Sequence, residues 1–149
     1  MSIEIKHLTE EDLSKFTSLS HLFNTVFEEE SKIASEANLL KLLNNNSFIA
    51  LVALAENEVV GGLTAYELPM YYSNGSEIFL YDLAVNPKYQ RMGVGKALLQ
   101  RLKEYCVGHG IREFFVMAHK EDEHAIEFYH ATGGKAENVI NFLYTADKD

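Results

Sequence analysis

Apolar and polar residues alternate along the chain with two periods, one typical of helices and one typical of strands. Apolar positions with helical spacing follow Thr9, and Asp12 stands three residues after it, as in a variant of the N-terminal capping pattern. The helices predicted in this way span 10–27, 36–43, 93–108 and 123–131. Short apolar runs bounded by turn-forming residues predict strands at 3–8, 48–55, 59–68, 77–85, 113–118 and 139–144.

The order of these elements, βααβββαβαβ, predicts an α/β domain with a mixed sheet. The chain has 149 residues, which is the usual size of one domain, and it contains no internal repeat and no linker rich in Pro, Ser or Gly. We therefore expect a single domain over 1–149. In such folds ligands collect where a strand turns into a helix, so the turn near the middle of the chain is the first place to look for a site.

Composition narrows the classes of function. The formal net charge is −9, which disfavours nucleic acids and anionic membranes as partners and favours cationic ligands. Cys106 is the single cysteine, so an intramolecular disulfide and a Cys-x-x-Cys metal site are both excluded. No apolar run approaches the ~20 residues that span a bilayer. The first residues also lack the pattern of a secretory signal, and we expect a cytoplasmic protein.

The segment 83–96 carries the clearest site signal. A buried strand ends at Asn86-Pro87, and a loop with Gly93 and Gly95 leads directly into a helix. Glycine lets the backbone approach an anion closely, and the free N–H groups of the first helical turn point toward that anion. Arg91 and Lys96 add positive charge beside it. This pattern predicts an anion-binding turn, but it matches neither the P-loop nor the dinucleotide fingerprint.

Here the sequence resembles the GNAT superfamily of acyl-CoA-dependent N-acetyltransferases. Residues 90–95, Gln-Arg-Met-Gly-Val-Gly, match the Gln/Arg-x-x-Gly-x-Gly/Ala signature of that superfamily. The resemblance implies the GNAT fold, an α+β architecture with a mixed, mostly antiparallel sheet flanked by helices, and acetyl-CoA as the cosubstrate. It also implies that the following residues of the strand, turn and helix bind the coenzyme: Leu83, Ala84, Val85, Gln90, Arg91, Met92, Gly93, Val94, Gly95 and Lys96.

A second GNAT signature lies at the expected distance, at 122–129 followed by Gly133. The resemblance implies that Asp122, Ala125 and Phe128 contact the coenzyme and that Tyr129 is the general acid for the departing thiolate. Family members usually have Asn where this chain has Asp122, and a Gly-Phe pair where it has Gly133-Gly134. Without the family, Tyr129 is better explained as a helix residue that packs its ring in the core, and the motif at Asp122 reverses that preference.

A narrower resemblance, to the aminoglycoside 3-N-acetyltransferases, lies in 48–54, 59–66 and 77–85, and its most specific part is Tyr81-Asp82-Leu83-Ala84-Val85. It implies acetylation of a primary amine of an aminoglycoside-like polycation, an activity of antibiotic resistance. A protonated amine must lose a proton before it attacks a thioester, and Asp82 is placed to hold the ammonium and accept that proton. A structural role for Asp82 stays open. Tyr81 also belongs to the expected acceptor site, although strand alternation predicts that it faces away from Asp82.

Two acidic clusters extend the expected acceptor site. Glu28, Glu29 and Glu30 follow the first helix, and Glu123 belongs to the run 121–123 before the last helix. Each cluster alone is typical of a solvated surface, but together with Asp82 they indicate a cleft for a polycation. His119 and His124 are further candidates for proton transfer, although isolated histidines are usually surface residues. The sequence shows no metal-ligand grouping, and the chemistry needs no metal.

Two alternatives stay open at this stage. In the same fold the acceptor is a polyamine, an amino acid derivative, or a protein lysine or N-terminus. In a different class of function the chain senses acyl-CoA without turnover, although the presence of both Asp82 and Tyr129 disfavours a sensor. The sequence does not decide between a monomer and a homodimer.

Overall fold

The computed structural model describes residues 2–30 and 32–147, and it forms two compact units, 1–117 and 118–149. The first unit contains β1 (Ile3–His7), the 3₁₀ turn η1 (Glu10–Asp12), α1 (Leu13–Val26), α2 (Glu36–Leu43), β2 (Phe48–Ala55), β3 (Glu58–Pro69), β4 (Ser76–Val85), the 3₁₀ turn η2 (Pro87–Tyr89), α3 (Val94–Gly108) and β5 (Phe114–Val116). The second unit contains α4 (Glu123–Ala131). That 1–149 acts as one domain stays a prediction.

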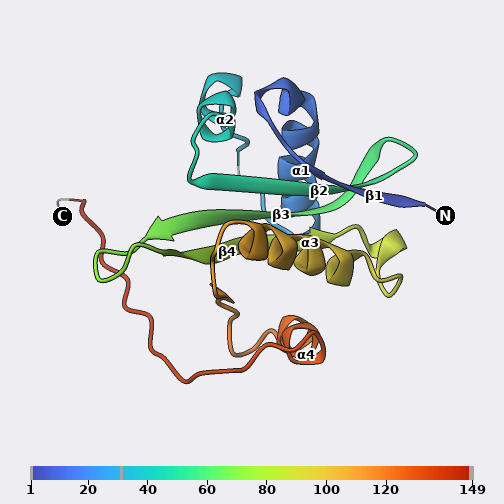
Figure 1. Cartoon of the computed structure of the whole chain (residues 1–149). Helices are drawn as coiled ribbons and strands as arrows, with labels where there is room; N and C mark the ends of the chain where they lie inside the picture. Colours follow the sequence, from blue (N-terminus) through green and yellow to red (C-terminus); the bar gives the residue numbers. More distant parts are fainter. Residues whose placement is uncertain (1, 31, 148–149) are drawn as a thin grey trace. The chain divides into compact units, whose positions relative to one another are not determined.

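The strands form one sheet in the order β1-β2-β3-β4-β5. The first four strands pair antiparallel, and β4 and β5 pair in parallel. In the first unit, α1 and α2 cover one face of this sheet and α3 covers the other (Figure 1). The predicted fold class, a mixed and mostly antiparallel sheet flanked by helices, is confirmed.

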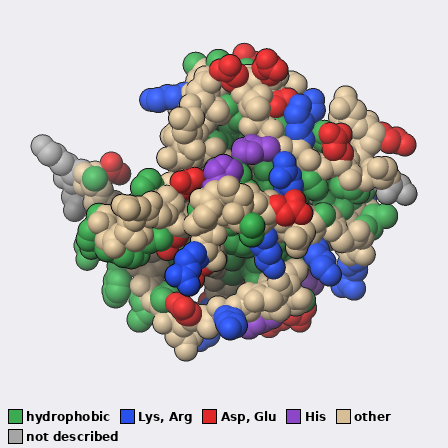
Figure 2. Space-filling model, in the orientation of Figure 1, with side chains coloured by type: hydrophobic (Ala, Val, Ile, Leu, Met, Phe, Trp, Pro, Cys, Tyr) green, Lys and Arg blue, Asp and Glu red, His purple; other side chains and the backbone are tan. Residues whose placement is uncertain are grey.

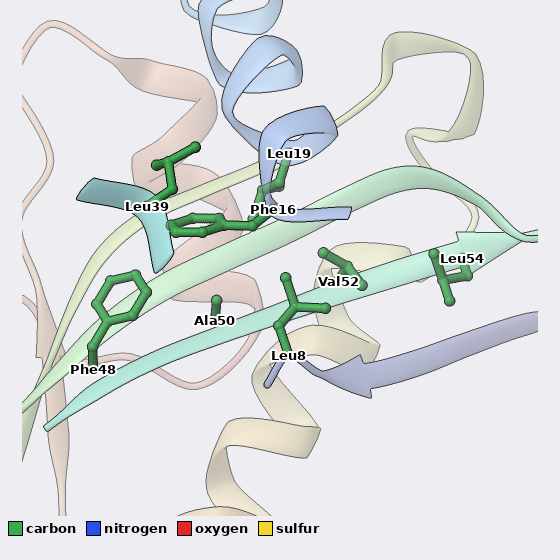
Figure 3. Close-up of a cluster of buried hydrophobic side chains, with 8 residues drawn as sticks. All are labelled: Leu8, Phe16, Leu19, Leu39, Phe48, Ala50, Val52 and Leu54. Atoms are coloured by element: carbon green, nitrogen blue, oxygen red, sulfur yellow. The ribbon is translucent and has the colours of Figure 1, made fainter. Parts of the chain in front are cut away.

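The face of the sheet under α1 and α2 is closed by an apolar cluster (Figure 3). Alternate residues of β2 supply one side, because side chains along a strand point to opposite faces in turn. The cluster consists of Leu8, which follows β1, Phe16 and Leu19 of α1, Leu39 of α2, and Phe48, Ala50, Val52 and Leu54 of β2. It anchors both helices on the sheet, and therefore also the end of α1 from which the run Glu28–Glu30 continues.

The predicted capping pattern at the first helix is confirmed. The Thr9 hydroxyl accepts from the backbone of Glu11, and the Asp12 carboxylate accepts from the Thr9 backbone at 2.9 Å. Lys6 donates to the same carboxylate at 2.8 Å. Burial raises the pKa of Asp12, but the hydrogen bonds from Lys6 and Thr9 outweigh burial and hold that pKa below its ordinary value.

The predicted strand at 139–144 is wrong. Among the residues that the structure describes, no strand follows α4. The apolar side chains of this segment are instead 71–88% exposed; they are Val139, Ile140, Phe142, Leu143 and Tyr144. Apolar composition favours a strand, but a strand also requires a neighbouring backbone for its N–H and C=O groups, and the pattern does not reveal whether one is present.

Candidate active site

Only the first half of β4 is hydrogen-bonded to β5, and the second half is not. In the described pairing, β5 accompanies β4 from Ile78 only as far as Leu80. From Tyr81 to Val85, β4 therefore pairs with β3 alone and has one open edge. Backbone groups on such an edge are free to bind an extended ligand. The strand positions at which coenzyme contacts were expected, Leu83 to Val85, all lie in this open part.

A β-bulge marks the point where β4 leaves β5. Thr64 pairs with Asp82 and Ala65 pairs with Leu80, so Tyr81 has no opposite residue on β3. The Tyr81 ring contacts the ring of Tyr66, whose strand position lies two residues from Thr64 and therefore on the same face. The expectation that Tyr81 faces away from Asp82 is wrong, because the extra residue of the bulge interrupts the alternation and leaves both side chains on the α1 face.

Asp82 is half-buried on β4, and its surroundings disfavour its charge. Burial raises the pKa of Asp82 above its ordinary value, and the negative charge of Glu29 raises that pKa further. A carboxylate with a raised pKa is a stronger base in its ionised form. The environment of Asp82 is therefore suited to accept a proton from an ammonium group.

The backbone conformation at the end of α1 sets the position of Glu29. Glu28 adopts a left-handed backbone conformation with φ of 54°, and the backbone N–H of Glu29 donates to Asn24 at 2.9 Å. Glu28, Glu29 and Glu30 are all exposed. The structure thus brings one member of the predicted acidic run, Glu29, into electrostatic contact with Asp82. It resolves no such contact for Glu28 or Glu30.

The turn between β4 and α3 is built by its own hydrogen bonds. The Asn86 side chain accepts from the backbone of Lys88 at 3.0 Å, and Pro87 begins η2. The side-chain amide of Gln90 donates to the Val85 carbonyl at 3.0 Å. Gln90 therefore fastens the turn to the end of β4. That it also contacts the coenzyme stays a prediction.

The residues after Gln90 present free backbone donors. Arg91 and Gly93 have φ of 64° and 82°, in the left-handed region, and α3 begins at Val94. The first helical hydrogen bond across this start is donated by Ala97 to the Gly93 carbonyl at 2.9 Å. The N–H groups that precede Ala97 belong to the unpaired first turn of a helix, where the dipole also favours an anion.

The turn has open space above Gly93. A Cβ added at Gly93 would meet no atom within 4 Å, so the turn opens to solvent at the point where the helical N–H groups gather. Arg91, Met92 and Lys96 are exposed around this opening, whereas Val94 and Gly95 are buried under it. The predicted turn residues therefore lie together, and their donors and charge suit an anionic group.

In the second unit, α4 is capped at both ends by local contacts. The Asp122 carboxylate accepts from the backbone of Ala125 at 3.1 Å. Asp and Asn serve equally well at an N-cap, which accounts for Asp122 where GNAT members usually have Asn. The Tyr129 carbonyl accepts from Gly134 at 2.8 Å, and the Tyr129 ring lies 5.3 Å from that of Phe128. The roles expected for Asp122, Glu123, Ala125, Phe128 and Tyr129 stay predictions.

Tyr66 is a site residue that the sequence analysis missed. It lies on β3, beside the bulge, and burial raises the pKa of its phenol, with further contributions from Tyr81 and Asp82. The register β3–β4 places Tyr66 opposite Phe79, next to the strand position of Asp82. The available signal was the hairpin itself, since pairing 59–68 with 77–85 puts aromatic residues of both strands on one face.

The described side chains and helices include neither a metal-ligand grouping nor a membrane-spanning helix. Within residues 2–30 and 32–147, no three His, Cys, Asp or Glu side chains are grouped so that they could hold a metal ion. In the same part of the chain, none of the helices has the length and apolarity that crossing a membrane requires.

The comparisons with known proteins agree with this geometry. The acetyltransferase (GNAT) family matches residues 13–133. An aminoglycoside acetyltransferase, meta-AAC0020, from an uncultured soil metagenomic sample, crystallised with trehalose, is 43% identical with a TM-score of 0.94 over 97% of both chains. Its complex with sisomicin is also similar, at 42% identity and the same TM-score and coverage.

More distant structures share the fold. The aminoglycoside acetyltransferase HMB0005, also from an uncultured soil metagenomic sample, is 35% identical with a TM-score of 0.93, over 99% of this chain and 100% of that one. The aminoglycoside N-acetyltransferase AAC(6')-Iy in complex with CoA is only 17% identical, with a TM-score of 0.83 over 98% of this chain and 96% of that one, which shows the fold alone. A search of curated proteins found no match.

Proposed function

Because the chain belongs to the acetyltransferase (GNAT) family and is an N-acetyltransferase that uses acetyl-CoA, we propose that it acetylates the 3-amino group of an aminoglycoside. The similar protein meta-AAC0020 was crystallised with the aminoglycoside sisomicin, which supports this class of acceptor. The 3-amino position rests on the resemblance of Tyr81-Asp82-Leu83-Ala84-Val85 to the aminoglycoside 3-N-acetyltransferases.

The observation that carries the proposal is the position of Asp82. Its half-buried carboxylate lies on the open part of β4, three residues before the strand ends at the anion-binding turn, and Glu29 interacts with it electrostatically. Two carboxylates at one place attract an acceptor with several ammonium groups, and the one with the raised pKa accepts a proton from one of them. An aminoglycoside meets both requirements.

The proposed transfer uses Asp82 as general base and Tyr129 as general acid. Acetyl-CoA supplies a thioester, whose carbonyl carbon forms a bond with the amine nitrogen while the C–S bond breaks. The ammonium loses two protons on becoming the amide: Asp82 takes the one that frees the amine for attack, directly or through a water molecule, and the second passes to solvent. The phenol of Tyr129 gives its proton to the departing sulfur, and both side chains then exchange protons with solvent.

The remaining predicted residues are proposed to hold the two substrates. The backbone of Leu83 and Val85, on the open edge of β4, is proposed to bind the pantetheine arm, and the turn 90–96 to bind the pyrophosphate. Asp122, Ala125 and Phe128 are proposed to complete the coenzyme site. Tyr81, Glu28, Glu29, Glu30 and Glu123 are proposed to bind the acceptor.

The choice of acceptor is tested by CoA release from purified enzyme with acetyl-CoA and a panel of amines. The panel contains sisomicin, spermidine, a free amino acid amide and a lysine-rich peptide. We expect the highest kcat/KM for sisomicin, with mass spectrometry and NMR locating the acetyl group on the 3-amino nitrogen. A clear preference for spermidine or for the peptide would contradict the proposed acceptor, and acetylation at another nitrogen would contradict the position.

Two substitutions test the residue roles in the same assay. Asp82→Asn keeps the shape but removes proton acceptance, and Tyr129→Phe removes only the phenolic hydroxyl group. Each should lower kcat by about 10²–10⁴-fold with little change in acetyl-CoA affinity, since general acids and bases act mainly in the transition state. Glu77→Gln, which removes a carboxylate from the other end of β4, is the matched control. If either variant kept a near wild-type kcat, the proposed catalytic role of the substituted residue would be contradicted.

A further inference from the structure

A row of aromatic side chains crosses the sheet on the face that α1 and α2 cover. Phe48 pairs with Tyr66, Tyr66 with Phe79, and Phe79 with Phe115, so the row runs through β2, β3, β4 and β5. The rings contact one another as well, at 5.3 Å between Phe48 and Tyr66 and at 4.9 Å between Phe79 and Phe115. The last pair is stacked almost in parallel, with 4° between the ring planes.

The row is buried at one end and exposed at the other. Phe48 is 8% exposed and belongs to the apolar cluster, whereas Phe115 is 40% exposed. An aromatic row that served packing alone would be covered along its whole length, because an exposed aromatic ring leaves much apolar surface in water. The exposed end is therefore the part that is available to a ligand.

Tyr81 also belongs to this exposed end, and the bulge brings Asp82 to the same face. Tyr81 is 57% exposed, and its ring is held edge-on by Tyr66 at 5.9 Å and by Phe79 at 5.5 Å. Simple alternation from Phe79 would leave Tyr81 on this face but turn Asp82 to the opposite face, away from the aromatic rings. The extra residue thus places a rigid, exposed ring next to the carboxylate proposed as general base.

A flat ring beside a carboxylate has a definite chemical preference. The face of an aromatic ring attracts cations and the polarised C–H groups next to an ammonium, and it offers a flat apolar surface. An aminosugar ring presents C–H groups on its faces and amines at its rim, so it satisfies the ring and the carboxylate together. A linear polyamine satisfies the carboxylates, but it has no ring face to lay against Tyr81.

We propose that Tyr81, supported by Tyr66 and Phe79 and extended by Phe115, is an aromatic platform that binds the C–H face of an aminosugar ring while Asp82 holds its amine. This inference rests on the proposed function and adds to it the feature that selects cyclic over linear polycations. Tyr81 and Phe115 contact the acceptor. Tyr66 and Phe79 are positioning residues, which fix the orientation of the Tyr81 ring.

The test compares Tyr81→Leu with Tyr81→Phe, using sisomicin as the acceptor. Tyr81→Leu removes the aromatic face and should raise the KM for sisomicin by about 5- to 10-fold, as expected for one aromatic contact with a cationic ligand. Its KM for acetyl-CoA should stay unchanged. Tyr81→Phe keeps the ring and should keep the wild-type KM for sisomicin. Tyr72→Leu, which removes another exposed tyrosine from the first unit, is the control and should change neither constant.

A second measurement separates acceptor binding from general damage to the fold. In saturation-transfer NMR with irradiation of the aromatic protons, the C–H protons of sisomicin should receive saturation from the wild type and from Tyr81→Phe, and at least 3-fold less from Tyr81→Leu. Tyr66→Leu, which removes support from the ring, should raise the KM for sisomicin by a smaller factor. An unchanged KM and unchanged saturation in Tyr81→Leu would overturn the platform alone. A wild type that does not acetylate sisomicin would overturn the proposed acceptor and the platform with it.

Discussion

At the scale of single residues, the protonation of Asp82 depends on its position in the chain's fold. Burial removes water from the carboxylate and Glu29 adds a like charge nearby, and both effects favour the neutral form. In the proposed mechanism the enzyme requires the ionised form, which accepts a proton from the amine. Its activity should therefore fall as the pH falls through the pKa of Asp82, which lies above the ordinary value of an aspartate.

Glu29→Gln should move this acidic limb. Since the charge of Glu29 raises the pKa of Asp82, its removal should lower that pKa and shift the acidic limb of kcat/KM to lower pH. The measurement is the pH profile of kcat/KM for sisomicin. Glu30→Gln removes an equal charge from the same acidic run and should leave the limb in place. An acidic limb that stays unchanged in Glu29→Gln, or moves to higher pH, would show that Glu29 does not act on the base.

At the scale of elements, the proposed coenzyme site depends on the backbone between β4 and α3. The turn brings Arg91 and Gly93 into the left-handed region and leaves the N–H groups at the start of α3 without helical partners. Gln90 holds this turn against the last residue of β4. The same short segment therefore joins the open strand edge, proposed for the pantetheine arm, to the anion-binding turn.

Gly93→Val should weaken the binding of acetyl-CoA. A valine at φ of 82° is strained, and its side chain would fill the open space above the helical N–H groups. The loss of charge-assisted hydrogen bonds to the phosphates should raise the Kd by about 10- to 100-fold in calorimetry. Gly110→Val is the matched control, because Gly110 has φ of 68° and is also surrounded by open space, at the far end of α3. Equal affinities in both variants would contradict the placement of the phosphates.

At the scale of the whole molecule, the packing of α1 on the sheet depends on a close approach at Gly62. A Cβ at Gly62 would lie 2.7 Å from the Leu51 carbonyl oxygen and would also collide with Cδ1 of Leu19, which is fully buried. Its neighbour Gly61 faces α3, where a Cβ would lie 3.2 Å from Cγ1 of Val94. The two adjacent glycines thus set how closely helices pack on opposite faces of the sheet.

Gly62→Ala should lower the free energy of unfolding by about 1–3 kcal/mol, the usual cost of overpacking a core. Gly61→Ala meets only moderate contacts at its own face and should cost less. Urea denaturation of both variants measures the difference, with the slope of the transition checking that both unfold in the same way. If Gly61→Ala proved the more destabilising variant, the close approach of Leu19 on α1 to Gly62 would not be the tighter of the two contacts.

On the face that Figure 2 shows, charged side chains of both signs are spread rather than gathered in one region. The chain has a net charge of −9, yet basic and acidic side chains are interspersed over the face that Figure 2 shows. The attraction of a polycation to this protein therefore depends on the few carboxylates at the acceptor site, because exposed charges more than about 10 Å away are screened at physiological salt. Asp82 and Glu29 are two carboxylates of this kind, because they are near enough for the charge of Glu29 to raise the pKa of Asp82.

Much of this arrangement was determined by the sequence alone, because it depends on neighbours along the chain. Hydrophobic periods predict α2, β2, β4 and α4 to within a residue or so, and Thr9 with Asp12 predicts the start of the first helix. The glycines of 90–96 predict an anion-binding turn, since left-handed backbone and an uncovered helix start are local properties. The tertiary structure confirmed the predicted elements, the capping pattern and the left-handed backbone of the turn, whereas anion binding by the turn stays a prediction.

Other features were decided only by the tertiary structure, because they depend on pairing between distant strands. The bulge at Tyr81 arises from the register between β3 and β4, and it places Tyr81 beside Asp82 against the simple alternation of a strand. Glu29 approaches Asp82 only because α1 packs across the sheet and ends nearby. The segment 139–144 has the composition of a strand but lacks one in the structure, since a strand forms only where another backbone pairs with it.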